Sequence, residues 1–260
     1  MMAVGTTLED AEQLCDLEEI RGRIHVAACN SQSSVTLSGD IDALEEAESA
    51  FKDEGKFVRK LKVDTAYHSH HMHPCAGPYI RSLESCNIRI QSPTKLKCTW
   101  FSSVTGKAMS PDDPSLLATY WSDNMTGRVN FAQAVGAAIE GEGAFTAAFE
   151  VGPHPALRGP ALQTFKEISG APIPYSGTLE RGSHDLEAFA DALGFAISFI
   201  QGEVLTLNDF IRTVSSKSLS IGKLLKDLPT YGWEHDRIYW METRLGRAFR
   251  TRNSPVHECK

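Results

Sequence analysis

The spacing of apolar residues in the first 63 positions is the feature that most constrains what this chain can fold into. Apolar side chains recur with helical spacing in two segments, which contain Leu8, Ala11 and Leu14, and then Ile41, Leu44, Ala47 and Phe51. Short runs typical of β-strands flank both segments, and a polar turn joins the runs at 24–29 and 35–38. The pattern predicts the order strand, helix, strand, strand, helix, strand.

Local signals mark the ends of the two helices. Thr6 and Glu9 have the spacing of a capping box, so we expect the first helix to begin at Thr6. Asp40 is expected to cap the second helix, and Gly55 to end it. A βαββαβ order is the split unit of ferredoxin-like folds, and residues 1–63 are therefore expected to form a small subdomain of that class.

Beyond residue 63, helices and strands alternate over longer distances. Strands are predicted at 99–104, 145–151 and 173–179, with helices around Phe131 and over 157–165 and 186–200. This alternation predicts a second, α/β-layered part over residues 64–203. From about Leu228 the sequence becomes aromatic and irregular.

Charge and cysteine content exclude several classes of function. The formal net charge is −7, whereas general nucleic-acid binding requires a broad basic face, and the arginines near the C-terminus are interpreted as a solvated face. The six cysteines are scattered without zinc-type spacing, which favours reduced thiols and a cytoplasmic location. The longest apolar run, 189–200, contains Asp191 and is too short to span a bilayer, so no membrane segment is expected.

A histidine cluster is the strongest chemical signal in the chain, because four of the six residues from 68 to 73 are histidine. A neutral imidazole accepts a proton from a hydroxyl or thiol, and it also binds metal ions. A strand-like run at 57–63 precedes the cluster, and a helix is expected within or just after it, near Pro74. His68 is therefore placed at a strand-to-helix junction, where loops commonly carry chemistry.

Two kinds of chemistry are open to this cluster, metal binding and nucleophilic catalysis. For a metal site, His68 and His70 would need His71 or His73 and a carboxylate or cysteine, and no such partner stands at ligand spacing, so no metal is expected. For nucleophilic catalysis, none of the 20 glycines is followed two positions later by serine, so the Gly-x-Ser-x-Gly elbow is absent. Cys75, beside Pro74, is interpreted as a packing residue.

The histidine cluster nevertheless resembles a known motif. The run Val63-Asp64-Thr65-Ala66-Tyr67-His68-Ser69-His70-His71-Met72 is similar to the catalytic-histidine motif of acyltransferase domains in type I polyketide synthases, especially the fungal highly reducing class. Further stretches resemble that family in the same order: Ala27 to Ser31, Val35 to Gly39, Tyr120 to Asn124, and Glu150 to Leu157. Together these stretches extend over residues 27–157 of the chain.

The resemblance implies a fold and specific roles. Residues 64–203 would be the C-terminal part of an α/β-hydrolase-like large subdomain, and residues 204–260 a linker leading to a dehydratase domain. His68 would be the catalytic base and then acid, and the backbone carbonyl of Asn124 would orient its imidazole. Tyr67, bulky where methylmalonyl-selective domains carry a small residue, would favour malonyl. The substrate would be malonyl-CoA, and the acceptor the phosphopantetheine thiol of an acyl carrier protein.

The resemblance also implies what these 260 residues lack. The family's serine elbow, its oxyanion donors and the arginine that pairs the malonyl carboxylate lie in a segment that precedes the resemblance. We therefore expect the chain to be inactive alone and to work with the ketosynthase, the front part of the acyltransferase, the dehydratase and the carrier protein. The alternative is a non-catalytic interaction module that docks on a synthase or carrier protein.

Overall fold

The structure is a computed structural model that describes residues 1–91, 98–143, 145–199, 227–229, 232, 236 and 241–252. The chain divides into two compact units, residues 1–204 and 205–260. In the second unit the structure describes one helix, α9 (Arg244–Arg252). The aromatic residues Trp233, Tyr239 and Trp240, which the sequence places in an irregular linker, lie outside the described residues.

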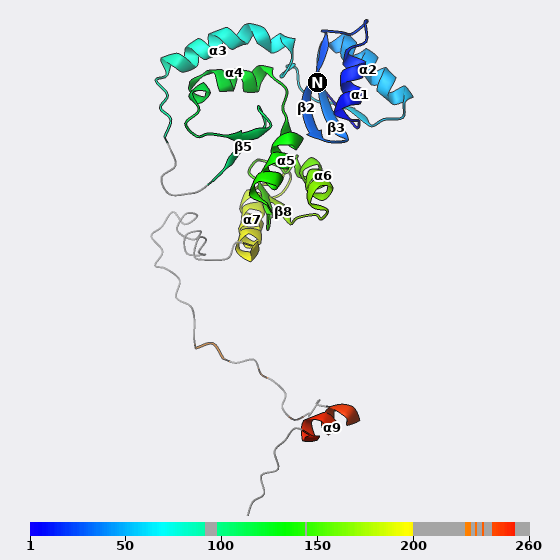
Figure 1. Cartoon of the computed structure of the whole chain (residues 1–260), viewed down its shortest axis with the longest axis vertical. Helices are drawn as coiled ribbons and strands as arrows, with labels where there is room; N and C mark the ends of the chain where they lie inside the picture. The colour runs from blue at the N-terminus through cyan, green and yellow to red at the C-terminus, as the bar shows by residue number, and fades with distance from the viewer. Residues whose placement is uncertain are drawn as a thin grey trace, which may run out of the picture. The chain divides into compact units, whose positions relative to one another are not determined.

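The first unit begins with a four-stranded sheet and two helices (Figure 1). The elements are β1 (Met2–Val4), α1 (Leu8–Cys15), β2 (Ile24–Ser31), β3 (Ser34–Gly39), α2 (Ile41–Asp53) and β4 (Val58–Lys60). The strands lie in the order β2-β3-β1-β4, and every neighbouring pair is antiparallel. The predicted sequence of strands and helices is therefore the one that the structure has.

The main hydrophobic core of the described residues belongs entirely to this N-terminal part. Phe51 from α2 and Leu37 from β3 are fully buried there, together with Met2 of β1 and Ala11 of α1. Every residue of this cluster lies between positions 2 and 58. Burial of apolar surface is the dominant stabilising contribution to folding, so these residues have a core of their own.

Some details of the two helices differ from the predictions. The residue that caps α1 is Thr7, whose hydroxyl accepts a hydrogen bond from the Asp10 amide, and not Thr6. Ile41 is 76% exposed because it lies in the first turn of α2, outside the stripe that faces the sheet. Asp40 occupies the N-cap position of α2, but its side chain makes no capping hydrogen bond.

The remainder of the first unit is mainly helical. Its helices are η1 (His70–Met72), α3 (His73–Ser85), η2 (Pro114–Leu117), α4 (Thr119–Thr126), α5 (Phe131–Glu142), α6 (Arg158–Ser169) and α7 (Asp185–Phe199). Its strands form two small sheets, antiparallel β5 (Trp100–Ser102) with β6 (Lys107–Met109), and parallel β7 (Ala148–Glu150) with β8 (Tyr175–Gly177). The described strands of this part thus pair only in twos, and β5, β7 and β8 are shorter than the strands predicted at 99–104, 145–151 and 173–179.

Backbone and side-chain hydrogen bonds join the four-stranded sheet to this helical part. The Cys29 amide donates to the Val129 carbonyl, and the Val129 amide donates to the Ala27 carbonyl, both at 2.8 Å. Ser31 in β2 donates to the Gln163 side chain in α6 at 2.7 Å. The two Val129 bonds hold the segment after α4 against β2, and the Ser31 bond holds α6 against the same strand. The histidine cluster lies beside β2 and the end of α4.

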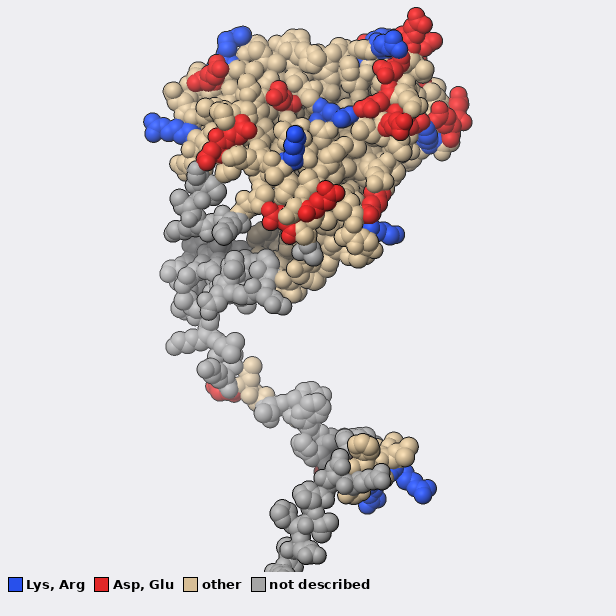
Figure 2. Space-filling view, viewed as in Figure 1, with Lys and Arg blue, Asp and Glu red and all other residues tan. Residues whose placement is uncertain are grey.

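Charged side chains of both signs are mixed on the face shown in Figure 2, with several acidic groups together at the upper right. The sequence of α2 contributes to the acidic character of the N-terminal part through Asp42, Glu45, Glu46, Glu48 and Asp53. Within the described residues, no helix combines the length and apolar character needed to cross a bilayer.

Candidate active site

His68 lies in the irregular segment between β4 and η1, in an unusual backbone conformation. Its φ angle is +62°, in the left-handed region that costs a non-glycine residue about 1–2 kcal/mol. Its amide donates to the Met125 carbonyl near the end of α4, at 3.2 Å. Strained residues of this kind persist only where neighbouring contacts impose them, and they are concentrated at functional sites.

A single backbone carbonyl holds the imidazole of His68. The Nδ1 atom lies 2.9 Å from the carbonyl oxygen of Gly127. This contact favours the tautomer in which Nδ1 carries the proton, because a carbonyl only accepts hydrogen bonds. The Nε2 atom then keeps its lone pair and can act as a base.

The orienting carbonyl is therefore not that of Asn124, which the resemblance had implied. Asn124 lies within α4 and is exposed, whereas Gly127 is the residue at which the chain leaves this helix. Gly127 adopts an extended conformation (φ −83°, ψ 166°), which turns its carbonyl out of the helical direction. Sequence spacing alone does not predict this change of direction at the end of the helix.

His68 lines a cavity of about 420 Å³ that is rich in imidazoles. The cavity lies between α1, β2, the histidine cluster and the end of α4, and its lining includes His25, His70, His73, Cys15 and Arg128. Burial, followed by the neighbouring His70, lowers the pKa of His25, so His25 is neutral near pH 7. Burial also raises the pKa of Cys15 to about 12, which keeps its thiol protonated and a weak nucleophile.

No hydroxyl or thiol of the described residues is hydrogen-bonded to His68. The adjacent Ser69 is buried, and its hydroxyl donates to the Ala66 carbonyl at 2.6 Å. Cys75 is exposed on α3, so it is not the packing residue that the sequence suggested. The described part of the chain thus holds the His68 imidazole in place without a hydroxyl or thiol hydrogen-bonded to it.

Tyr67 lies beside His68. Its side chain is 48% exposed, and its ring centroid is 6.4 Å from that of His68. A bulky ring in this position occupies space next to the imidazole.

The side chain of Glu150 links the stretch from Glu150 to Leu157 to the neighbouring strand β8. The Glu150 carboxylate accepts hydrogen bonds from the Leu157 amide at 3.1 Å and from the Tyr175 hydroxyl at 2.6 Å. Burial, with the contribution of Glu150, raises the pKa of Tyr175 well above its usual range. His154 accepts a bond from the Arg181 amide at 3.4 Å and is not among the residues lining the His68 cavity.

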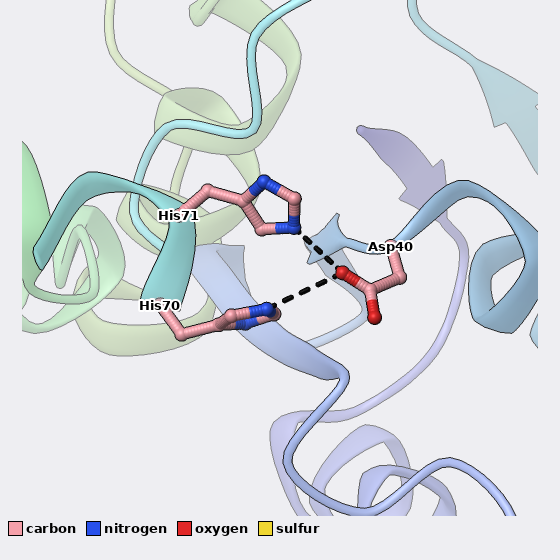
Figure 3. Close-up of side chains that lie close together, drawn as sticks. All are labelled: Asp40, His70 and His71. Atoms are coloured by element: carbon pink, nitrogen blue, oxygen red, sulfur yellow. Dashed lines mark hydrogen bonds and ion pairs between the residues drawn. The ribbon is translucent and has the colours of Figure 1, made fainter. Parts of the chain in front are cut away.

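A second side-chain group, which sequence reasoning missed, is formed by Asp40, His70 and His71 (Figure 3). The Nε2 atoms of His71 and His70 lie 2.6 Å and 3.3 Å from the same carboxylate oxygen of Asp40. The hydrogen bond from His71 lowers the pKa of Asp40. Asp40 precedes the histidines by about thirty positions and looks like an ordinary helix cap, so no local signal indicates this partnership.

Comparisons with known proteins agree with this arrangement. Residues 1–197 match the family model described as the acyl transferase domain. The chain belongs to the acyl transferase family. The acyl transferase part of the motif-based resemblance is thereby confirmed.

Fungal synthases are among the relatives of this acyltransferase chain. It is 48% identical over 258 residues to the reducing polyketide synthase BOA6 of Botryotinia fuckeliana and 49% identical over 259 residues to the hybrid PKS-NRPS synthetase mpsA of Macrophomina phaseolina. These matches cover 99% of the chain but only 10% and 6% of the two relatives. The chain thus spans a tenth or less of their length.

A solved structure supports the same fold. The acyltransferase domain from module 8 of the salinomycin polyketide synthase superposes with a TM-score of 0.66 at 26% identity. The match covers 76% of this chain and 44% of that domain. The chain is thus a mixed α/β protein similar to part of a polyketide synthase acyltransferase domain.

Proposed function

We propose that this chain supplies the catalytic base of a polyketide synthase acyltransferase domain, which loads malonyl units from malonyl-CoA onto an acyl carrier protein. The observation that carries the proposal is the contact between His68 Nδ1 and the Gly127 carbonyl, which leaves Nε2 as the basic nitrogen. The left-handed backbone at His68 supports it, because such a conformation is rarely kept without a role.

In the proposed reaction, the hydroxyl of a serine from outside these 260 residues attacks the thioester carbonyl of malonyl-CoA. His68 Nε2 removes the hydroxyl proton as the bond forms and returns it to the departing CoA thiolate, leaving a malonyl-serine ester. The phosphopantetheine thiol of the carrier protein then gives its proton to His68 and attacks the ester. The serine oxygen recovers that proton when the malonyl group leaves.

We propose further that the isolated chain does not catalyse transfer. Triad residues act as a unit, and a base without its nucleophile retains little beyond binding. Incubation of the purified chain with radiolabelled malonyl-CoA is expected to leave no covalent label. A stable acyl-enzyme at any serine of this chain would contradict this part of the proposal.

Complementation tests the role of His68 directly. A separately expressed segment that carries the Gly-x-Ser-x-Gly elbow, taken from a fungal relative, is added together with carrier protein, and malonyl transfer is measured. Transfer is expected with the native chain and with His184→Ala, an exposed histidine before α7, but not with His68→Ala. Equal transfer by the His68→Ala and His184→Ala chains would refute the assignment. If the native chain supports no transfer even with the added segment, but binds the carrier protein by itself, the docking-module alternative is favoured.

The same complemented system tests substrate choice. The ring of Tyr67 lies beside that of His68. On the proposed function it would occupy space that a branched acyl chain needs. We propose that Tyr67→Ala increases the use of methylmalonyl-CoA relative to malonyl-CoA, whereas Tyr67→Phe, which keeps the ring, does not. An unchanged ratio for both variants would remove Tyr67 from the specificity residues.

We also propose the domain assignment that follows from this function. Residues 1–63 would be the ferredoxin-like small subdomain, supported by the order β1-α1-β2-β3-α2-β4 and the antiparallel sheet. Residues 64–203 would be the C-terminal part of an α/β-hydrolase-like large subdomain, and residues 204–260 the linker towards a dehydratase. The ketosynthase, the front part of the acyltransferase and the dehydratase would be its partners within one synthase.

A further inference from the structure

We propose that Asp40, His70 and His71 form a binding site for one divalent transition-metal ion, with zinc as its most suitable occupant. This site is separate from the acyl-transfer chemistry of His68, and its existence does not depend on the proposed function. The three residues come from two distant parts of the sequence, the start of α2 and the turn η1 (Figure 3).

The distances between the three side chains suit a metal ion. Their ligand atoms all lie within 4.8 Å of one another. In a tetrahedral zinc site with bonds of about 2.0–2.1 Å, neighbouring ligand atoms are about 3.3 Å apart. Asp40 Oδ1 and His70 Nε2 are 3.3 Å apart, and the shorter 2.6 Å separation from His71 requires only a small side-chain rotation. Two imidazoles and one carboxylate, with the remaining position open to water, are a ligand set that zinc accepts.

The conformation of Asp40 provides an independent argument. An aspartate at an N-cap position ordinarily accepts a hydrogen bond from a backbone amide of the first turn, which stabilises a helix by about 1 kcal/mol. The Asp40 carboxylate makes no such bond and faces the two histidines instead. The Asp40 carboxylate thus contacts His70 and His71 instead of an amide of its own helix. This is expected of a residue that binds a ligand together with the two histidines.

His70 is the least satisfied member of the group. Its Nδ1 atom is buried without a hydrogen-bond partner. Its Nε2 atom points at a carboxylate oxygen that already accepts a closer hydrogen bond from His71. Two imidazole nitrogens thus converge on one oxygen. A cation bound among the three atoms would take the lone pair of each Nε2, with the proton of each neutral ring then on Nδ1.

The second oxygen of Asp40 defines how the ion would be held. Arg23 Nε lies 3.5 Å from Asp40 Oδ2, so this oxygen is engaged away from the histidines. Asp40 would therefore bind the metal through Oδ1 alone. The positive charge of Arg23 also weakens the attraction for a cation, and Arg23→Gln is expected to strengthen metal binding.

Metal binding would tie the N-terminal subdomain to the turn that carries the base. Asp40 follows β3 directly, and His70 is two residues after His68. A metal bond between them would restrict the movement of His68 relative to the sheet.

Zinc titration of the whole 260-residue chain tests the proposal. The protein is stripped with a chelator, transferred to metal-free buffer and titrated with Zn²⁺ in competition with a metal-sensitive dye. One ion per chain is expected, and Co²⁺ in its place should give the intense visible absorption of a four-coordinate site. Asp40→Asn and His71→Gln are each expected to weaken zinc binding by at least about tenfold.

His73→Gln is the matched control, because His73 is an exposed neighbour of the same cluster but lies outside the three-residue group. It should bind zinc as the native chain does. His71 is itself about half exposed, so its replacement tests the site even if Asp40→Asn fails to fold, which circular dichroism reveals. Failure of the folded native chain to bind one zinc ion would overturn the proposal, as would undiminished binding by His71→Gln or an equal loss in His73→Gln.

Discussion

Gly39 is the position at which a single methyl group should do most damage to the junction beneath the histidine cluster. It ends β3 directly before Asp40, with a φ angle of +154° that side-chain-bearing residues rarely adopt. A Cβ atom placed there would lie 2.1 Å from the Arg23 carbonyl oxygen and 2.7 Å from the Ile24 Cα atom. Both neighbours are backbone atoms, one just before and one at the start of the paired strand β2, so Gly39→Ala is expected to force the two strands apart.

Two changes contribute to the loss of unfolding free energy in Gly39→Ala. The Asp40 amide donates to the Arg23 carbonyl at 2.9 Å, and loss of a backbone hydrogen bond of this kind costs about 1 kcal/mol. The backbone conformation adds about 1–2 kcal/mol for a residue with a Cβ atom. The expected loss of unfolding free energy is therefore about 2–3 kcal/mol, which lowers the folding equilibrium constant by between about thirtyfold and about one hundred and fiftyfold.

Gly55→Ala is the matched control for this prediction. Gly55 also has a positive φ angle, +72°, but an added Cβ atom would meet nothing within 4 Å. Its expected cost is the conformational part alone, about 1 kcal/mol. Urea unfolding followed by circular dichroism measures both variants against the native chain. Equal destabilisation by the two substitutions would refute the argument from close approach, since only Gly39 has a backbone neighbour.

Two further predictions concern the His68 cavity. His68→Gly should be about 1 kcal/mol more stable than His68→Ala in urea unfolding, because glycine adopts a φ of +62° without strain, and equal stabilities would contradict the strain at this residue. At pH 8 a thiol with a pKa of about 12 is about a thousandfold less ionised than an ordinary one, so iodoacetamide should label Cys15 far more slowly than the exposed Cys75. Rapid labelling of Cys15 at pH 8 would show that burial does not control the ionisation of this thiol. The thiol also makes stability depend on pH, because in the unfolded chain it loses its proton at a lower pH than in the folded chain. The contribution of Cys15 to the free energy of unfolding should therefore fall as the pH rises from about 9 to about 12.

Local pattern determined much of the N-terminal part. The helical spacing of Ala11 and Leu14 and of Leu44, Ala47 and Phe51 places apolar side chains on one face, and these side chains form the core. The same pattern could not place the exact cap at Thr7, since two adjacent threonines offer equivalent hydroxyls. Ile41 fitted the helical period but lies exposed in the first turn, where the sheet does not cover it.

The sequence by itself determined the order of elements in residues 1–63, the family through its motifs, and His68 as the candidate base. All of these depend on residues that are close together along the chain. Only the tertiary structure decided that Gly127 holds the imidazole and that Asp40 meets His70 and His71. These contacts depend on the direction in which α4 ends and on how β3 approaches the histidine turn. The number of positions between two residues in the sequence does not predict such directions, because the packing of whole helices and strands against one another sets them.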